Sequence, residues 1–249
     1  MIITKNNKMG DVIMHDYTLI TILNRFGIKL GFKEQTVEQI CEKHKINTDF
    51  FLEIINAFHD ENYFTEKKLK SFSIKLIIEF LQNSHQIYLQ KRIPQINDLI
   101  EKMDFEVNSE KYKQIIYNFF SEYKQELINH IYHEENNIYP YVLELENVLN
   151  QNTVTQDFVK KIKTESIKNY SEEHNGIDVK LTDLKSILIK YLPPPVNYEI
   201  SNIVLSKLFK LEADLKNHSK LEERVMIPVA EKMEQQILND INNNVKKIV

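Results

Sequence analysis

A pattern of polar residues occurs twice in this chain. His130–Pro140 reads HIYHEENNIYP, and His218–Pro228, 88 residues later, reads HSKLEERVMIP. Both follow H-x-x-x-E-E-x-x-x-x-P and share no other identity, so the polar positions recur while the apolar ones do not. On a helix, residues i and i+4 lie on the same face, about 6 Å apart along the axis. Two such helices facing each other would offer two His and two Glu to a shared metal centre.

The scarcity of helix-breaking residues predicts long helices. The chain has 249 residues but only 4 Gly and 6 Pro, with 42% hydrophobic and 27% charged residues. Few breaks in a chain rich in Ile, Leu, Lys and Glu favour long helices joined by a small number of loops. The length accommodates one large domain, or a medium domain and a small one.

Charge and hydropathy argue against several classes of protein. The net charge of −4 and the pI near 6.1 imply no general attraction to nucleic acid or to an anionic membrane. No apolar run approaches the roughly 18 residues needed to span a bilayer, and the N-terminal MIITKNNKMG lacks the apolar stretch of a secretory signal. Cys41 is the only cysteine, which excludes a disulfide or a thiolate cluster within one chain. We therefore expect a cytoplasmic protein without nucleic-acid or membrane partners.

The apolar spacing predicts an all-α fold: an antiparallel four-helix bundle preceded by a small three-helix N-terminal domain. The expected domains are residues 1–66 and 67–249. The short N-terminal helices are expected at Asp16–Phe26, at Thr36–His44 and at Phe50–Phe58, the last capped by Thr48. The long helices are expected at Ser71–Met103 with Pro94 inside, at Glu110–Leu149, at Asp157–Tyr191 and at Glu199–Asn242.

Each helix of this bundle carries a histidine. His85 lies on the first helix and His174 on the third, while the second and fourth carry the pairs His130/Glu134 and His218/Glu222. Four imidazoles and two carboxylates without a thiolate suit two Fe, Mn or Zn ions, which the carboxylates can bridge. A single H-x-x-x-E is commonly an exposed helix contact of little energetic value. The repetition on alternate helices favours a metal site.

The residues that flank these ligands have secondary interpretations. Glu135 and Glu223 lie well around the helix from the histidines, as solvated or ligand-supporting groups, and His133 flanks the site. Pro140 and Pro228 each remove a backbone hydrogen bond, which predicts a kink or a loosened turn just past each carboxylate. Cys41 shares an apolar helix face with Val37 and Ile40, so we expect a buried, inert thiol.

Several motifs resemble one family. They are H-x-x-Y-x-x-x-R-x-P at His85–Pro94, E-L-x-x-H-x-x-x-E-E at Glu126–Glu135, E-H at Glu173 and His174, and L-E-x-D-L-x-x-H-x-x-x-E-E-x-x-x-x-P at Leu211–Pro228. In order and spacing they resemble the iron–sulfur cluster repair di-iron proteins (the RIC family, YtfE/ScdA-like), a branch of the hemerythrin-like HHE group.

The resemblance implies two non-haem iron ions, bridged by oxo and carboxylate groups. The implied ligands are His85, His130, Glu134, His174, His218 and Glu222, with Glu173 and His133 as candidates to orient them. It further implies repair of iron–sulfur clusters damaged by nitrosative or oxidative stress, with NO, O2 and damaged iron–sulfur proteins as partners. A homodimer through the N-terminal domain is compatible with the sequence.

This chain departs from that family in its N-terminal domain, because the N-terminal domain of the family carries an adjacent cysteine pair. The corresponding segment, Phe26–Ile46, would place the pair near Leu30 and Gly31, where this chain has no cysteine. A mechanism that uses those thiols for redox exchange or iron transfer is therefore in doubt.

Other functions stay open at this point. A hemerythrin-like sensor or regulator that binds O2 or NO is the main alternative. Thr36–Phe58 scans as a helix-turn-helix, but residues 1–62 contain seven Lys or Arg and nine Asp or Glu, which disfavours DNA binding. O2 storage has less support because the chain carries an N-terminal domain. Hydrolysis by a metal-bound hydroxide has less support because the sequence shows no separate acid–base motif.

Overall fold

The computed structural model describes residues 2–60, 62–170 and 177–248, which are mainly helical. These residues form two compact units: Met1–Ser84 with Arg224–Met226, and His85–Glu223 with Ile227–Val249. The helix α6 (Ile74–Ile87) begins in the first unit and ends in the second. The domain boundary expected at residue 66 therefore stays a prediction.

The first unit contains short helices closed by local caps. They are α1 (Met9–His15), the 3-10 helix η1 (Tyr17–Leu19), α2 (Ile20–Arg25), α3 (Val37–His44), α4 (Thr48–His59) and α5 (Glu66–Leu69). Thr36 and Gln39 form a reciprocal capping box at the start of α3. Asn47, rather than the expected Thr48, caps α4 by accepting a hydrogen bond from the backbone N–H of Phe50. The three expected helices are present, and α1 and α5 were not predicted.

Aromatic side chains form the core of this unit. The rings of Phe26 and Phe51 meet edge-on with centroids 5.0 Å apart, and Phe50 contacts Phe72 in the same way at 5.3 Å. Cys41, on α3, is fully buried. Burial raises the pKa of its thiol to about 11, against a weaker opposite effect of a hydrogen bond with Thr48. The expected burial of Cys41 is confirmed, and its low reactivity stays a prediction.

Three of the long bundle helices are each interrupted by a π-helical turn. The first consists of α6, η2 (Tyr88–Arg92) and α7 (Ile93–Glu101), and the second of α8 (Ser109–His133), η3 (Glu134–Ile138) and α9 (Tyr139–Leu149). The last consists of α13 (Tyr198–Leu221), η5 (Glu222–Met226) and α14 (Ile227–Asn242). A π turn holds one more residue than an α turn, so it widens the helix locally.

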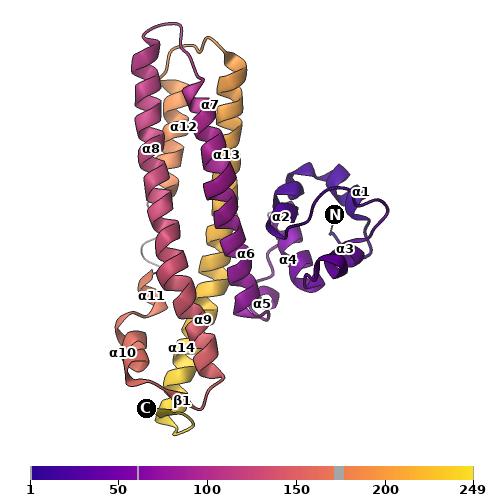
Figure 1. The fold of residues 1–249 in the computed structure, drawn as a ribbon, viewed down its shortest axis with the longest axis vertical. Helices are drawn as coiled ribbons and strands as arrows, with labels where there is room; N and C mark the ends of the chain where they lie inside the picture. The colour runs from indigo at the N-terminus through magenta and orange to yellow at the C-terminus, as the bar shows by residue number, and fades with distance from the viewer. Residues whose placement is uncertain (1, 61, 171–176, 249) are drawn as a thin grey trace. The chain divides into compact units, whose positions relative to one another are not determined.

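The second unit is a four-helix bundle, which confirms the expected all-α fold. Helix α7 packs against α8 and α13, and α12 (Ile177–Lys190) packs against the same two helices, so the four close a ring (Figure 1). Buried residues such as Tyr88, Phe120, Leu184 and Leu208 fill its centre. Beyond the π turns, α9 packs against α14.

The expected third helix is broken, and this part of the prediction was wrong. Instead of one helix over Asp157–Tyr191, the chain forms α10 (Gln156–Thr164), α11 (Ile167–Tyr170) and α12. Glu165 leaves the helical region with φ −128° and ψ 41°. The backbone N–H of Ile167 then donates to the Glu234 carboxylate instead of a helical carbonyl. A short parallel pair, β1 (Thr153–Val154) and β2 (Lys247–Ile248), joins the end of the chain to the loop before α10.

Candidate metal centre

The π turns lie where the repeated motif places its carboxylates. Glu134 and Glu222 are the first residues of η3 and η5, and the backbone carbonyl of each accepts a hydrogen bond from the N–H five residues later. Pro140 and Pro228 lie six residues after these carboxylates, where each ring would crowd an α-helical carbonyl four residues back. The wider turn relieves this crowding, so the expected loosened turn is present as a π-helix.

Four side chains converge at this level of the bundle. Ligand atoms of His85, Glu134, His218 and Glu222 all lie within 4.8 Å of one another, and all four residues are buried. The Nε2 atom of His85 lies 3.0 Å from Nε2 of His218 and 3.1 Å from Oε2 of Glu134. The Nε2 atom of His218 lies 3.4 Å from Oε1 of Glu222. Donor atoms from three bundle helices therefore point at one small volume.

Of the two remaining predicted ligands, the structure describes one. The Nε2 atom of His130 lies 2.9 Å from Oε1 of Glu134, so His130 reaches the same carboxylate from one turn before it. His174, together with Glu173, lies outside the described residues.

The electrostatics of this cluster favour a bound cation. Burial opposes the charged imidazolium of His85, but hydrogen bonds to Glu134 and Glu135 outweigh it and raise its pKa to about 9. Burial also opposes charge on Glu134, yet hydrogen bonds from His130 and His85 hold the pKa of that carboxyl well below its usual range. Two fully buried carboxylates thus require nearby positive charge, which protons or a metal can supply. Imidazole nitrogens with carboxylate oxygens are a suitable donor set for iron, manganese or zinc.

The predicted flanking residues have distinct surroundings. Oε1 of Glu135 lies 2.8 Å from Nδ1 of His85 and accepts a hydrogen bond from it. This carboxylate can therefore orient the imidazole ring and fix its tautomer. His133 Nδ1 lies 3.0 Å from the amide nitrogen of Asn137, and its ring lies beside that of Tyr170.

Two tyrosines at the cluster were not predicted from the sequence. The hydroxyl of Tyr139 donates to Oε1 of Glu222 at 2.6 Å, and the hydroxyl of Tyr170 donates to Oε1 of Glu134. Tyr139 directly precedes Pro140 in the first copy of the motif, where the second copy has Ile227. That asymmetry could have indicated Tyr139, whereas nothing in the local sequence marks Tyr170 as a partner of Glu134.

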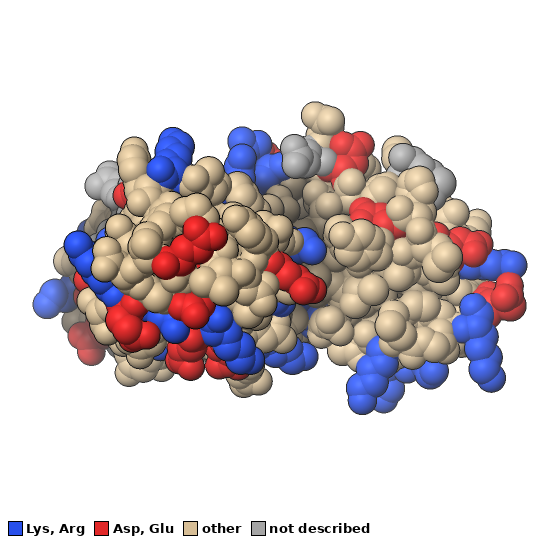
Figure 2. Space-filling view, turned by 90° about the horizontal axis from the view of Figure 1, so that it is seen from above, with Lys and Arg blue, Asp and Glu red and all other residues tan. Residues whose placement is uncertain are grey.

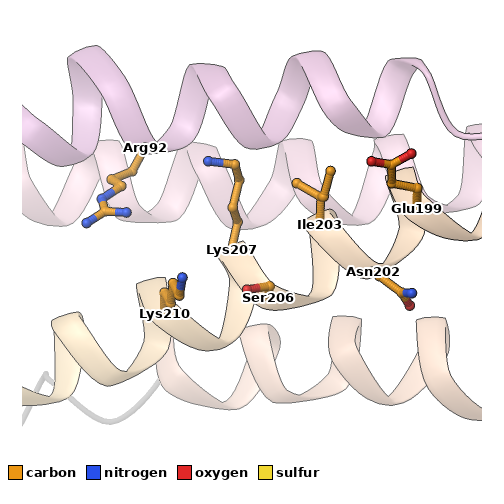
Figure 3. Close-up of a pocket in the computed structure, with 7 residues that line it drawn as sticks. All are labelled: Arg92, Glu199, Asn202, Ile203, Ser206, Lys207 and Lys210. Carbon is orange, nitrogen blue, oxygen red and sulfur yellow. The ribbon is translucent and has the colours of Figure 1, made fainter. Parts of the chain in front are cut away.

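Hollows in the described surface of the bundle unit include the following two. One, of about 530 Å³, is lined by residues of η3, α9, α10 and α11 and includes Tyr170, which also contacts Glu134. The other, of about 620 Å³, lies along α13, with Arg92, Lys207 and Lys210 toward one end and Glu199 toward the other (Figure 3). The excess of positive charge in the second hollow suits an anion rather than a metal ion.

The surface charges are mixed rather than segregated on the face seen in Figure 2, where acidic and basic side chains are interspersed. Within the described part of the chain, no helix combines the length and the apolar character that crossing a bilayer demands.

The comparisons with known proteins give one match. The model of the hemerythrin HHE cation-binding domain matches residues 76–230, which include all the ligand candidates. A comparison with curated proteins returns no match to the chain. The matched segment spans more than half of the chain and contains the buried His/Glu cluster. This chain therefore belongs to the hemerythrin HHE cation-binding domain family and is a metal-binding protein.

Proposed function

We propose that this chain is a non-haem di-iron protein that acts in the repair of iron–sulfur clusters damaged by nitrosative or oxidative stress. The proposed ligands are His85, His130, Glu134, His174, His218 and Glu222. The observation that carries the proposal is the buried convergence of two imidazoles and two carboxylates from three helices. The motifs shared with the cluster-repair branch favour that role over O2 storage.

The residues around the cluster have definable tasks in such a protein. Glu134 and Glu222 are fully buried, so their charge is poorly solvated and strongly favours a cation. Glu135 orients His85, while Tyr139 and Tyr170 each hold one carboxylate oxygen and so restrict its rotation. Iron bound here would supply coordination of small diatomic molecules and one-electron chemistry.

Access to the cluster is also compatible with this role. The hollow of about 530 Å³ shares Tyr170 with the cluster, so a molecule in it lies one side chain away from Glu134. NO or O2 is small enough to use such a route. Damaged iron–sulfur proteins as partners, a cytoplasmic location and a homodimer are further parts of the proposal.

The first experiment measures metal content and the absorption spectrum. We expect wild-type protein from iron-replete cells to contain about two iron ions per chain, with near-ultraviolet charge-transfer absorption. The double variant Glu134→Ala/Glu222→Ala should lose both, while Glu223→Ala, which changes an exposed carboxylate beside Glu222, should keep both. Zinc or no metal in well-folded wild type would refute the di-iron centre.

A second experiment tests the repair role separately. The iron-loaded protein is incubated with an NO-damaged [4Fe–4S] enzyme, and the recovery of that enzyme's activity is measured. The proposal expects recovery with wild type and none with Glu134→Ala/Glu222→Ala. A protein that binds iron and NO but restores no activity would instead be a sensor or regulator.

A further inference from the structure

A second buried carboxylate lies outside the candidate metal centre. Glu234, on α14, is 5% exposed and accepts hydrogen bonds from three donors. The hydroxyl of Tyr141 donates at 2.5 Å and the backbone N–H of Ile167 at 2.9 Å, both to Oε1, while the hydroxyl of Ser166 donates to Oε2 at 2.7 Å. This number of donors compensates the charge of a buried carboxylate.

These bonds fix the short segment that carries Tyr170. Helix α11 has four residues, too few to be stable in isolation, so tertiary contacts must hold it. Ser166 precedes α11 and Ile167 is its first residue, so Glu234 binds the start of the helix. Tyr170 lies one turn after Ile167, both are buried, and the Tyr170 hydroxyl meets Glu134.

We propose that Glu234 is a positioning residue for the metal centre: it anchors the start of α11 so that the hydroxyl of Tyr170 holds Glu134 in its metal-binding orientation. This inference rests on the proposed metal-binding role of Glu134. The chain of contacts runs from Glu234 through Ser166 and Ile167 to Tyr170 and then to Glu134.

The chemistry of the contacts favours a carboxylate at this position. A carboxylate offers only acceptors, with two oxygens that can serve three donors at once, whereas a glutamine replaces one oxygen by an amide donor. Burial and the hydrogen bond to Glu234 raise the pKa of Tyr141, so its phenol stays protonated and keeps donating. Glu234→Gln therefore preserves the side-chain size, but it makes all three hydrogen bonds neutral, about half as strong as charge-assisted ones, and requires the Ser166 hydroxyl to change from donor to acceptor.

The first test is a double-mutant cycle in metal affinity. Tyr170→Phe, Glu234→Gln and the double variant are titrated with Co2+, whose visible absorption reports its coordination. Loss of a group that orients a ligand weakens metal binding by about 10- to 100-fold. We expect the Co2+ affinity of each single variant to fall about tenfold. The affinity of the double variant should fall no further than that of the weaker-binding single variant, because both changes break one chain of contacts.

The matched control is Glu231→Gln, the same change one turn earlier on α14, at a partly exposed position. It should bind Co2+ like wild type. Ser166→Ala keeps the Glu234 carboxylate and removes one of its donors, so it should lower the Co2+ affinity by a smaller factor. This variant also tests the proposal if Glu234→Gln does not fold. Losses that add in the double variant, or wild-type affinity in Glu234→Gln, would overturn the proposal.

The second test needs no metal. Lys168 is exposed on α11, so trypsin cleavage after it reports how firmly the segment is held. In metal-free protein, Glu234→Gln should be cleaved there several-fold faster than wild type and Glu231→Gln. If the wild-type protein binds Co2+ and Glu234→Gln is cleaved no faster than wild type, the positioning role alone is overturned. If wild type binds neither Co2+ nor iron, the proposed function is overturned, and the role of Glu234 with it.

Discussion

The hydroxyl of Tyr139 is expected to stabilise the bundle by a measurable amount. Tyr139 is fully buried, and its hydroxyl donates to Oε1 of Glu222 at 2.6 Å. Burial and the charges of Glu222 and Glu134 raise the pKa of Tyr139 well above its usual value, so the phenol remains a donor. Tyr139→Phe keeps the ring but leaves the buried carboxylate with one donor fewer.

The size of the effect depends on the charge of the acceptor. A hydrogen bond to an ionised group contributes about 1.5–3 kcal/mol, so the free energy of unfolding of metal-free protein should fall by about 2 kcal/mol. For a protein of this size that corresponds to a decrease in Tm of about 4–8 °C. Urea unfolding followed by circular dichroism measures the change.

The control for this experiment is Tyr132→Phe. Tyr132 is also on the second bundle helix, but it is 67% exposed, so its hydroxyl can bond to water. This substitution should change the free energy of unfolding by less than about 0.5 kcal/mol. Equal stabilities of the two variants would refute the argument that the Tyr139–Glu222 bond stabilises the fold.

Two further predictions concern the first unit. Because Cys41 is buried and its pKa is raised to about 11, its thiol should not react with a disulfide reagent in native protein at neutral pH, and one thiol per chain should react after unfolding; rapid native reaction would contradict this. Burial raises the pKa of Asp16, but hydrogen bonds from Thr18 and His59 outweigh it and lower the pKa below 3.8. The stabilisation from Asp16 is therefore present above pH 3.8 and lost as the pH falls through the folded-state pKa. Asp16→Asn keeps a capping oxygen but removes the charge, so it should lower the free energy of unfolding by about 1 kcal/mol above pH 3.8 and leave it unchanged below the folded-state pKa, as measured by urea unfolding at each pH. A difference that does not change with pH would refute the ionic origin.

The π turns give the repeated motif a structural meaning beyond its ligands. The same order, a turn of π-helix and then a proline at the second position of the next α-helix, also occurs at Tyr88–Pro94, which has no copy of the His/Glu pattern. Three bundle helices therefore widen close to the residues of the cluster. A wider turn shifts the register of the residues after it, so the same helix can present ligands inward and still bury its apolar face beyond them.

The sequence by itself determined the helical architecture and much of the candidate site. Helical periodicity depends on residues three or four apart, so it predicted the bundle helices over most of their length. The i, i+4 spacing placed His130 with Glu134 and His218 with Glu222, because both members lie on one helix face. The proline six residues beyond each carboxylate predicted the loosened turns.

The tertiary structure alone decided how separate helices meet at the site. Tyr139 and Glu222 are 83 residues apart, Tyr170 and Glu134 are 36 apart, and Ile167 and Glu234 are 67 apart. No local pattern encodes such pairs, because each depends on which helices become neighbours when the bundle closes. The break between α10 and α11 has the same origin: residues 157–170 read as a continuous helix, but the buried Glu234 carboxylate binds Ser166 and the N–H of Ile167. A buried charge requires donors, and it obtains them from whichever segment packs against it.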